Sequence, residues 1–361
     1  MTRVIITGGV GFIGHALVEH VLKNTDWDII IIDKLSYASK GFDRLRSMGI
    51  KFGEEDRVRI FTFDLCNPLT VGLKKEFGEV NYIVHLAANT HIDDSIADPV
   101  PFIKNNVMST VHMLEYARTL DSLQIFFYFS TDEVFGSAPG DISYTEEDKH
   151  NPTNPYSASK SAAEQICMSY NNTYRVPVIV CNTMNAFGER QHVEKFIPKV
   201  IKAILHSELI EVHADSSCTI PGSRFFIHSR NIAAAVLYLI HHGEIGQKYN
   251  IRGEREVNNL ELVQLIHKLM LEISNEENSL LRQMIYRYIP SQPVILPKGV
   301  TNKPIVRLVN FHESRPFHDL RYCLDGTKLQ ELGFRLPVDF EESLKKTIFW
   351  TLKNPDWLIW E

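Results

Sequence analysis

The stretch Thr7-Gly8-Gly9-Val10-Gly11-Phe12-Ile13-Gly14 decides how the rest of the chain is interpreted. An apolar, strand-like run, Arg3 to Thr7, comes directly before its glycines, and helical periodicity continues from Phe12 to Lys23. A second apolar run, Asp28 to Ile32, ends in Asp33. A strand, a glycine turn, a helix and a strand in this order form the βαβ context that a dinucleotide-binding fingerprint requires.

Each part of this unit suits a phosphate-containing ligand. Glycines allow a tight turn and a close approach of backbone to pyrophosphate, and the helix N-terminus supplies N–H groups and positive potential. Asp33 follows Gly14 by 19 residues, so it is placed to bond the ribose hydroxyls, which favours NAD over NADP. Lys34 works slightly against that preference. The alternative is a glycine-rich turn without a ligand, and the spacing argues against it.

Further apolar runs predict more strands, at residues 57–63, 81–86, 125–129, 176–180 and 248–251. Because helical segments separate most of them, we expect an α/β fold with a Rossmann-type, doubly wound parallel sheet. Helices are expected at residues 156–174, 194–206, 232–241, 260–273 and 339–352. The segment 213–222 is expected to be irregular, and 275–304 to be mixed and mainly loop.

Ligands of such a sheet bind at the carboxyl ends of its strands. The glycine turn, Asp33, Asp64, Ala87-Ala88 and the segment Ser130 to Glu133 all follow predicted strands. We therefore expect them to share one edge of the sheet. Asp64 either bonds the adenine amino group or caps a turn before a proline, and both interpretations stay open.

Length and composition limit the possible classes of protein. A chain of 361 residues, 44% of them hydrophobic, predicts an NAD-binding domain over residues 1–183, to which 224–250 returns. A smaller α/β substrate domain is expected over 184–361. A formal net charge of −6 without a long charged run argues against nucleic acid as the main partner. No apolar run approaches the length of a membrane span, and the N-terminus lacks the pattern of a signal peptide.

The cysteines and histidines predict neither disulfides nor a metal site. The five cysteines are scattered and contain no C-x-x-C pair, which favours reduced thiols in the cytoplasm. The 15 histidines form no recognised ligand spacing, so we expect no metal.

Tyr156 and Lys160 are four residues apart and lie on one face of a predicted helix. A lysine beside a phenol is expected to lower the phenol pKa from about 10. A phenolate can then take a hydroxyl proton while NAD⁺ oxidises the same carbon, with Ser130 or Thr131 holding that hydroxyl. Two ordinary helix residues are the alternative, which the cofactor fingerprint makes less attractive.

The pair Asp132-Glu133 distinguishes elimination from simple dehydrogenation. Two carboxyls at a strand end can divide acid and base roles when their surroundings differ. One would protonate a departing hydroxyl while the other removes a proton from the neighbouring carbon, once a ketone has acidified it. The alternative is an Asp-Glu pair that only caps a turn or a helix.

These stretches resemble the extended short-chain dehydrogenase/reductase superfamily, and within it the nucleoside-diphosphate-glucose 4,6-dehydratases of the dTDP-glucose type. The resemblance covers nearly the whole chain. It is carried by residues 7–14 (TGGVGFIG), 33–39 (DKLSYAS), 85–96 (HLAANTHIDDSI), 130–136 (STDEVFG), 156–160 (YSASK), 185–198 (NAFGERQHVEKFIP) and 315–325 (RPFHDLRYCLD).

The resemblance implies a catalytic role for each of five residues. Tyr156 would start oxidation at sugar C4 with help from Lys160 and Thr131. Glu133 would remove the C5 proton, and Asp132 would protonate the departing C6 hydroxyl. The product would be a 4-keto-6-deoxy sugar nucleotide, with tightly bound NAD regenerated in each turnover.

The resemblance also extends the binding sites. Cofactor contacts are expected at Gly8, Gly11, Phe12, Ile13, Gly14, Asp33, Lys34, Leu35, Ser36, Asp64, Leu65, Leu86, Ala87, Ala88, Thr90, Asn105, Ser130, Tyr156 and Lys160. Contacts with a nucleoside-diphosphate sugar are expected at Thr90, Thr131, Asn185, Glu194, Lys195, Phe196, Arg224, Asn250, Arg315 and His318. A homodimer through helices around residues 106–120 and 156–174 is implied as well.

The chain departs from the family pattern mainly on the sugar–nucleotide side. The family has a different sequence at five places, which in this chain are Asn89-Thr90, Asp94, Ala186, the segment Arg224-Phe225-Phe226 and Arg252. The nucleotide base and the hexose therefore stay open. A 4-epimerase or decarboxylase of the same superfamily, or an NAD-binding sensor, are the alternatives to a dehydratase. An epimerase has no need of Asp132, and a sensor has no need of Tyr156 or Lys160.

Overall fold

The computed structural model describes residues 2–206, 208–276, 306–310 and 320–359. The chain divides into two compact units, and each is described here by itself. The first comprises Met1–Met184, Ser229–Arg252 and Tyr322–Pro337, and the second Asn185–His228, Gly253–Arg321 and Val338–Glu361. The segment that returns to the first unit is thus Ser229–Arg252, where 224–250 is expected from the sequence, and Tyr322–Pro337, expected in the substrate domain, also belongs to the first unit.

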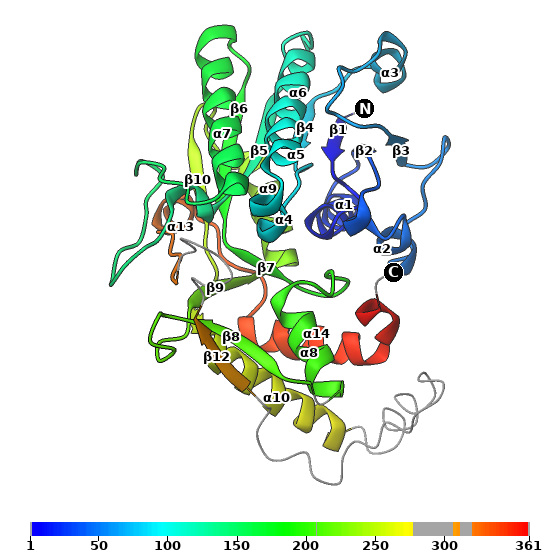
Figure 1. Cartoon of the computed structure of the whole chain (residues 1–361). Coiled ribbons are helices and arrows are strands. Elements are labelled where there is room, and N and C mark those ends of the chain that lie inside the picture. The colour runs from blue at the N-terminus through cyan, green and yellow to red at the C-terminus, as the bar shows by residue number, and fades with distance from the viewer. Residues whose placement is uncertain (1, 207, 277–305, 311–319, 360–361) are drawn as a thin grey trace. The chain divides into compact units, whose positions relative to one another are not determined.

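The first unit is built on a seven-stranded sheet (Figure 1) with the order β10-β6-β5-β4-β1-β2-β3. Every pairing between these strands is parallel. The strands are β1 Arg3–Thr7, β2 Asp28–Asp33, β3 Val58–Thr62, β4 Tyr82–His85, β5 Ile125–Thr131, β6 Val178–Thr183 and β10 Lys248–Ile251. The prediction of a Rossmann-type α/β fold is confirmed.

The strand order reverses between β1 and β4, because β1 pairs with β2 on one side and with β4 on the other. In sheets of this kind the crevice at such a reversal, at the carboxyl ends of the strands, receives the ligand. The glycine turn leaves β1 at this point, so the cofactor fingerprint lies where the topology requires it.

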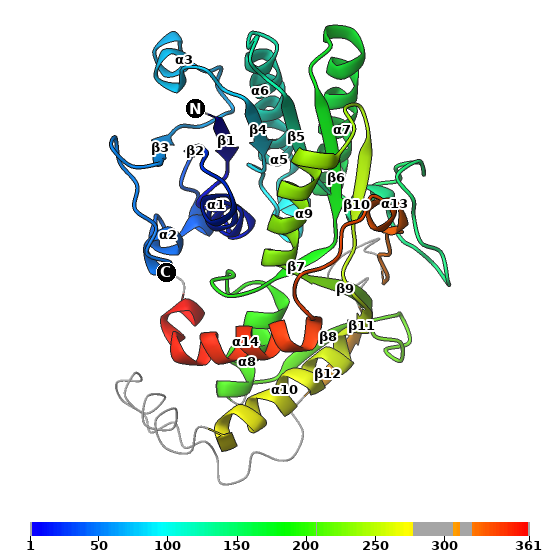
Figure 2. The same cartoon turned by 180° about the vertical axis from the view of Figure 1, so that it is seen from behind.

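Helices cover both faces of the sheet. Helix α1 (Phe12–Asn24) packs against α9 (Ser229–His242), and α7 (Pro155–Tyr174) packs against α5 (Pro99–Ile103) and α6 (Ser109–Ala117). Figures 1 and 2 show the two groups on opposite sides of the strands. The remaining helices of this unit are α2 Asp43–Ser47, α3 Val71–Phe77, α4 Ile92–Ala97 and α13 Thr327–Glu331.

The strands are nearly continuous apolar runs because both of their faces are buried. In β2, Ile29 to Ile32 are buried without a break, and all seven residues of β5 are buried. One face forms a core with Met113 and Leu114 of α6 and with Ala163 and Cys167 of α7. Helix α7 is therefore held against the sheet by apolar packing.

The second unit has two small sheets. One has the order β11-β9-β7, and the other pairs β12 with β8. Its elements are β7 Asn185–Phe187, α8 Phe196–His206, β8 Ile210–Ala214, β9 Ser223–His228, β11 Glu256–Asn258, α10 Asn259–Glu276, β12 Val306–Asn310 and α14 Phe340–Lys353. Residues 213 and 214, expected to be irregular, end β8, and β9 was not expected.

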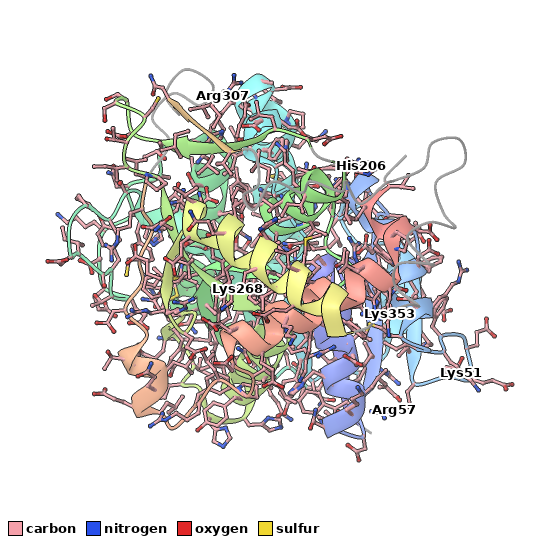
Figure 3. The ribbon with its side chains drawn as sticks, turned by 90° about the horizontal axis from the view of Figure 1, so that it is seen from below. Lys51, Arg57, His206, Lys268, Arg307 and Lys353 are labelled. Carbon is pink, nitrogen blue, oxygen red and sulfur yellow. The ribbon has the colours of Figure 1, made fainter. Side chains whose placement is uncertain are left out.

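Helix α10 shows how this second unit separates apolar from polar side chains. Leu262, Val263 and Ile266 are buried in a core shared with α8 and α14. Lys268 lies on the outer side of the helix (Figure 3), where 71% of its side chain is exposed. Among the described residues, no helix is both long enough and apolar enough to cross a membrane.

Candidate active site

The glycine turn forms a cradle whose backbone is packed too closely for side chains. Gly8 has a φ of +71°, and a Cβ on it would lie 3.0 Å from the amide nitrogen of Ala87. A Cβ on Gly14 would lie 2.1 Å from the carbonyl oxygen of Gly8. Glycine therefore lets the turn pass directly into α1, which starts after Gly11, and a glycine turn that leads into a helix N-terminus fits the pyrophosphate of a dinucleotide.

Asp33 is fixed beside this turn at the end of β2. Its carboxylate accepts hydrogen bonds from the Leu35 amide at 2.9 Å and from the Val10 amide at 3.3 Å. Burial raises its pKa, and these amides and the nearby Arg44 and Lys34 oppose the rise. The carboxylate is in place to accept hydrogen bonds from ribose hydroxyls.

Arg44 is a residue of this region that sequence reasoning missed. It is fully buried, and its guanidinium donates to the carbonyl oxygens of Val10, Ala38 and Ser39. It therefore connects the glycine turn to the loop that follows β2, which contains the predicted contacts Leu35 and Ser36. A charged residue in a five-residue helix gives no sequence signal of burial.

The predicted contacts Asp64, Leu65, Lys34 and Asn105 gather at one place. The Asp64 carboxylate accepts the Cys66 amide at 2.9 Å, which is the turn-capping role left open above. The Lys34 ammonium donates to the Asn105 side chain at 2.6 Å. Asn105 belongs to a single π-helical turn, Lys104–Met108, between α5 and α6.

A buried polar chain fixes the backbone after β4. The Thr7 hydroxyl accepts the amides of Leu86 and Ala87, both at 3.1 Å, so its own proton goes to Nδ1 of His85, 2.8 Å away. Nε2 of His85 then donates to the Thr110 hydroxyl at 3.1 Å. Burial, and secondarily Lys160, lowers the pKa of His85 to about 3, so this imidazole is neutral. His85 was also missed by sequence reasoning.

The Thr131-Asp132-Glu133 triplet forms a tight turn at the end of β5. Thr131 precedes a 3₁₀ turn over Asp132–Phe135, and its hydroxyl accepts the Glu133 amide at 3.4 Å. The same hydroxyl donates to the Asp132 carboxylate at 3.0 Å. Asp132 is buried, whereas Glu133 is half-buried. The turn-capping and functional interpretations are therefore compatible with each other. Thr131 caps the turn, and the two carboxyls have different surroundings.

Tyr156 meets this triplet from α7. The helix starts with an Asn154 cap whose side chain accepts the Ser157 amide at 2.8 Å and donates to the Glu133 carboxylate at 3.4 Å. Burial raises the pKa of Tyr156, the carboxylates of Glu133 and Asp132 raise it further, and a hydrogen bond with Thr131 opposes the rise. The phenol is thus a hydrogen-bond partner of Thr131, and the charges of Asp132 and Glu133 act on it.

The expected effect of Lys160 on Tyr156 is not found in the protein by itself. The Lys160 ammonium donates to the Phe129 carbonyl at 2.7 Å and lies 4.4 Å from the centre of the Tyr128 ring. Burial lowers the pKa of Lys160 to about 8. The lysine is thus directed at β5, and the prediction that it lowers the Tyr156 pKa is wrong for the chain alone.

The predicted substrate contacts are divided between the two units. Thr90, Thr131 and Asn250 belong to the first unit. Asn250 is fully buried, and its amide donates to the carbonyls of Tyr144 and Asp325 at 3.0 Å. It holds two loops together, and this geometry does not favour its predicted role.

Five other predicted contacts, Asn185, Glu194, Lys195, Phe196 and Arg224, lie in the second unit. Lys195 pairs with Glu194 at 3.2 Å, and the buried Arg224 donates to the carbonyls of Ser223 and Leu320, both at 2.6 Å. Arg315 and His318 lie outside the described residues.

Known proteins are similar to this chain over nearly its whole length. The family model described as GDP-mannose 4,6 dehydratase matches residues 5–347. The dTDP-glucose 4,6-dehydratase of Neisseria gonorrhoeae is 33% identical over 98% of this chain and 96% of its own length. A trifunctional protein of Arabidopsis thaliana that includes UDP-glucose 4,6-dehydratase is 32% identical, and the chain spans 48% of it.

A solved structure is also similar over the whole length. The dTDP-glucose 4,6-dehydratase DesIV of Streptomyces venezuelae, a double mutant with NAD and DAU bound, has a TM-score of 0.81 and 28% identity. The match covers 99% of this chain and 98% of that one.

Proposed function

The chain belongs to the GDP-mannose 4,6 dehydratase family, and from that membership we propose that it dehydrates a nucleoside-diphosphate hexose to a 4-keto-6-deoxy sugar nucleotide. The observation that carries the proposal is the meeting of Tyr156 with Thr131, Asp132 and Glu133 at the carboxyl end of β5. An oxidation site needs the tyrosine, and a water-eliminating site also needs an acid and a base.

NAD is the cofactor that these residues fit. Gly8, Gly11 and Gly14 allow the tight turn into α1 that a pyrophosphate site requires, and Asp33 is bonded to the same turn and suits the ribose hydroxyls. Bound NAD would supply the hydride acceptor for oxidation at C4 of the sugar and the hydride donor for reduction at C6. The redox change therefore cancels within one turnover, and the net reaction is that of a hydro-lyase.

The protein's own side chains handle the protons. Tyr156 must be ionised before it can take the proton of the C4 hydroxyl, which the Thr131 hydroxyl helps to hold. Burial and the two carboxylates oppose this ionisation in the chain by itself, because they raise the pKa of Tyr156. The ketone that oxidation leaves at C4 acidifies the C5–H bond, from which Glu133 takes a proton, while Asp132 gives a proton to the departing C6 hydroxyl. Water leaves, and as the hydride returns to C6 the protonated Glu133 gives a proton back to C5. Asp132, left ionised, and Tyr156, left protonated, return to their starting states through solvent.

Supporting evidence for this division comes from the surroundings of the two carboxyls. Asp132 is 4% exposed and bonded by the Thr131 hydroxyl. Glu133 is more exposed and bonded by the Asn154 amide. Different surroundings are what two carboxyls require in order to act as an acid and a base at the same pH.

The nucleotide is proposed only by class. Relatives named for dTDP-glucose and for UDP-glucose are similarly identical to the chain, and the chain departs from the family pattern at Thr90, Asp94 and Phe225. Either base is therefore compatible with the proposal.

We further propose a cytoplasmic homodimer. All five cysteines are free thiols, which suits a reducing compartment.

A partner surface would suit the exposed apolar side chains on or beside the helices expected at the interface. These side chains are Ile103, Met108 and Tyr174. A molar mass of two chains by light scattering is expected, and a single-chain mass at micromolar concentration would contradict the dimer.

The test of function is a panel of nucleotide hexoses incubated with the purified protein without added cofactor. We expect mass spectrometry to show the loss of one water from a single substrate. A product of unchanged mass with inverted C4 would indicate an epimerase instead, and no reaction with any hexose would contradict the proposal.

A further inference from the structure

Glu164 is a buried charged residue for which the proposed chemistry has no role. It lies on α7 one turn after Lys160, and its side chain has no exposed surface. A carboxylate removed from water is costly unless cations and hydrogen-bond donors surround it. Its surroundings therefore indicate what the residue does.

Three segments of the first unit converge on this carboxylate. His150, in the loop before α7, places Nε2 3.2 Å from one oxygen, and Lys248 of β10 places its ammonium 3.5 Å from the same oxygen. The side-chain amide of Asn182, on β6, donates to the other oxygen at 3.0 Å. Burial acts to raise the pKa of Glu164, but His150, Lys248 and Ser130 lower it below its usual value.

Two of these contacts lead directly to the catalytic turn. The Asn182 amide also donates to the Thr131 carbonyl at 3.2 Å, across the β5–β6 pairing. The His150 ring packs edge-on against Phe135 with centroids 5.1 Å apart, and its Nδ1 is 2.8 Å from the Ser161 hydroxyl of α7. Glu164 is thus connected to the first residue of the turn and, through His150, to the last.

We propose that Glu164 is a positioning residue, whose carboxylate holds the Thr131–Phe135 turn against α7 through Asn182 and His150. This inference rests on the proposed function, because it concerns the same turn. The residue touches neither substrate nor cofactor in the proposal.

The charges around Glu164 determine the sign of its effect. The groups that face it are His150, Lys248 and Lys160, together with Tyr128 and Cys167, whose pKa values burial raises and Glu164 raises further. Burial lowers the pKa of Lys160 to about 8, while Glu164, Cys167 and Cys181 oppose this. Removing the Glu164 charge should therefore make Lys160 lose its proton at a lower pH, and removing the Lys248 charge should not.

The experiment compares Glu164→Gln, Glu164→Asp and Lys248→Met with the wild type. For Glu164→Gln we expect kcat to fall about tenfold or more with KM changed less than about twofold, because small misplacements of catalytic groups act on kcat. The alkaline limb of its pH profile should move down by about half a unit or more. Glu164→Asp keeps the charge, so it should lose kcat without moving the limb.

The control is Glu342→Gln. Glu342 lies on α14, pairs with Lys346 at 2.6 Å, and has 62% of its side chain exposed. Neither kcat nor the alkaline limb of the pH profile should change in this variant.

For Lys248→Met, the alkaline limb should stay where it is in the wild type or move to higher pH.

The inference would be overturned if Glu164→Gln had the kcat and the alkaline limb of the wild type. It would also be overturned if the alkaline limb of Lys248→Met moved to lower pH. If Glu164→Gln does not fold, the test rests on Glu164→Asp. An unchanged kcat in Glu164→Asp would then overturn the inference about Glu164. An NMR titration of the Lys160 side chain, assigned with Lys160→Arg, gives the same answer without turnover. Failure of the proposed function would instead appear as a wild type that eliminates no water.

Discussion

At the scale of single residues, Asp132 separates water elimination from the simpler chemistry of an epimerase. Its carboxyl is buried in the turn after β5 and accepts the Thr131 hydroxyl at 3.0 Å. An asparagine at this position retains an oxygen for that hydrogen bond but has no acidic proton. Asp132→Asn should therefore preserve the turn and remove only the acid.

For Asp132→Asn we expect oxidation at C4 to proceed near the wild-type rate while water loss slows about 100-fold or more, in the range of general acid catalysis. A single-turnover experiment measures both, by absorbance of the reduced nicotinamide and by product mass. Asp121→Asn, at an exposed position, is the control. Water loss at the wild-type rate in Asp132→Asn would show that another group is the acid.

Gly14 tests the cofactor cradle. Because a Cβ at this position would lie 2.1 Å from the Gly8 carbonyl oxygen, Gly14→Ala must displace the turn. We expect the purified variant to contain little or no NAD and to be less stable by about 1–3 kcal/mol.

The matched control for the cradle is Gly72→Ala, on α3, where the nearest atom to a new Cβ is 3.8 Å away. Alanine is favoured in a helix by about 1 kcal/mol, so this variant should keep its NAD and its stability. Nucleotide released by acid and counted by chromatography gives the result. A full complement of NAD in Gly14→Ala would show that the turn does not carry the pyrophosphate.

At the scale of elements, the cap of α7 joins helix stability to catalysis. Asn154 and Ser157 form a reciprocal capping box, and the Asn154 amide also reaches Glu133 at 3.4 Å. A single side chain therefore starts the helix that carries Tyr156 and orients the proposed base.

These two roles can be separated by substitution. Asn154→Ser keeps a good N-cap, so the melting temperature should stay close to wild type while C5 proton exchange with deuterated solvent slows. Asn154→Ala should lose the cap as well, at about 1 kcal/mol. If Asn154→Ser exchanges the C5 proton as fast as wild type, the amide does not orient Glu133.

Element prediction succeeded where a local pattern carried the information. The apolar strands from β1 to β5 and the glycine turn lie where periodicity placed them, because a doubly covered parallel sheet leaves long buried runs in the sequence. Strand β8 was missed even though Ile210, Val212 and Ala214 alternate with less buried residues. The polar residues next to this strand hid the short alternation of apolar and polar residues that predicts a strand.

At the scale of the whole molecule, contacts between distant segments could not be read from one sequence. The hydrogen-bonded chain of Thr7, His85 and Thr110 joins residues that are 78 and 25 positions apart in the sequence. Arg44 and Glu164 resemble surface residues until the fold buries them. The Tyr156–Lys160 spacing was correct for a shared helix face, but the Phe129 carbonyl, 31 positions from Lys160, directs the lysine elsewhere.

The central claim is that one bound NAD oxidises C4 and then reduces C6 of the same sugar, with water lost between the two steps. The most direct measurement uses the hexose identified by the panel, deuterated at C4, without added cofactor. The account predicts a product that has lost one water and carries the deuterium in its C6 methyl group. A product that keeps the water, or whose methyl group lacks the deuterium, would contradict it.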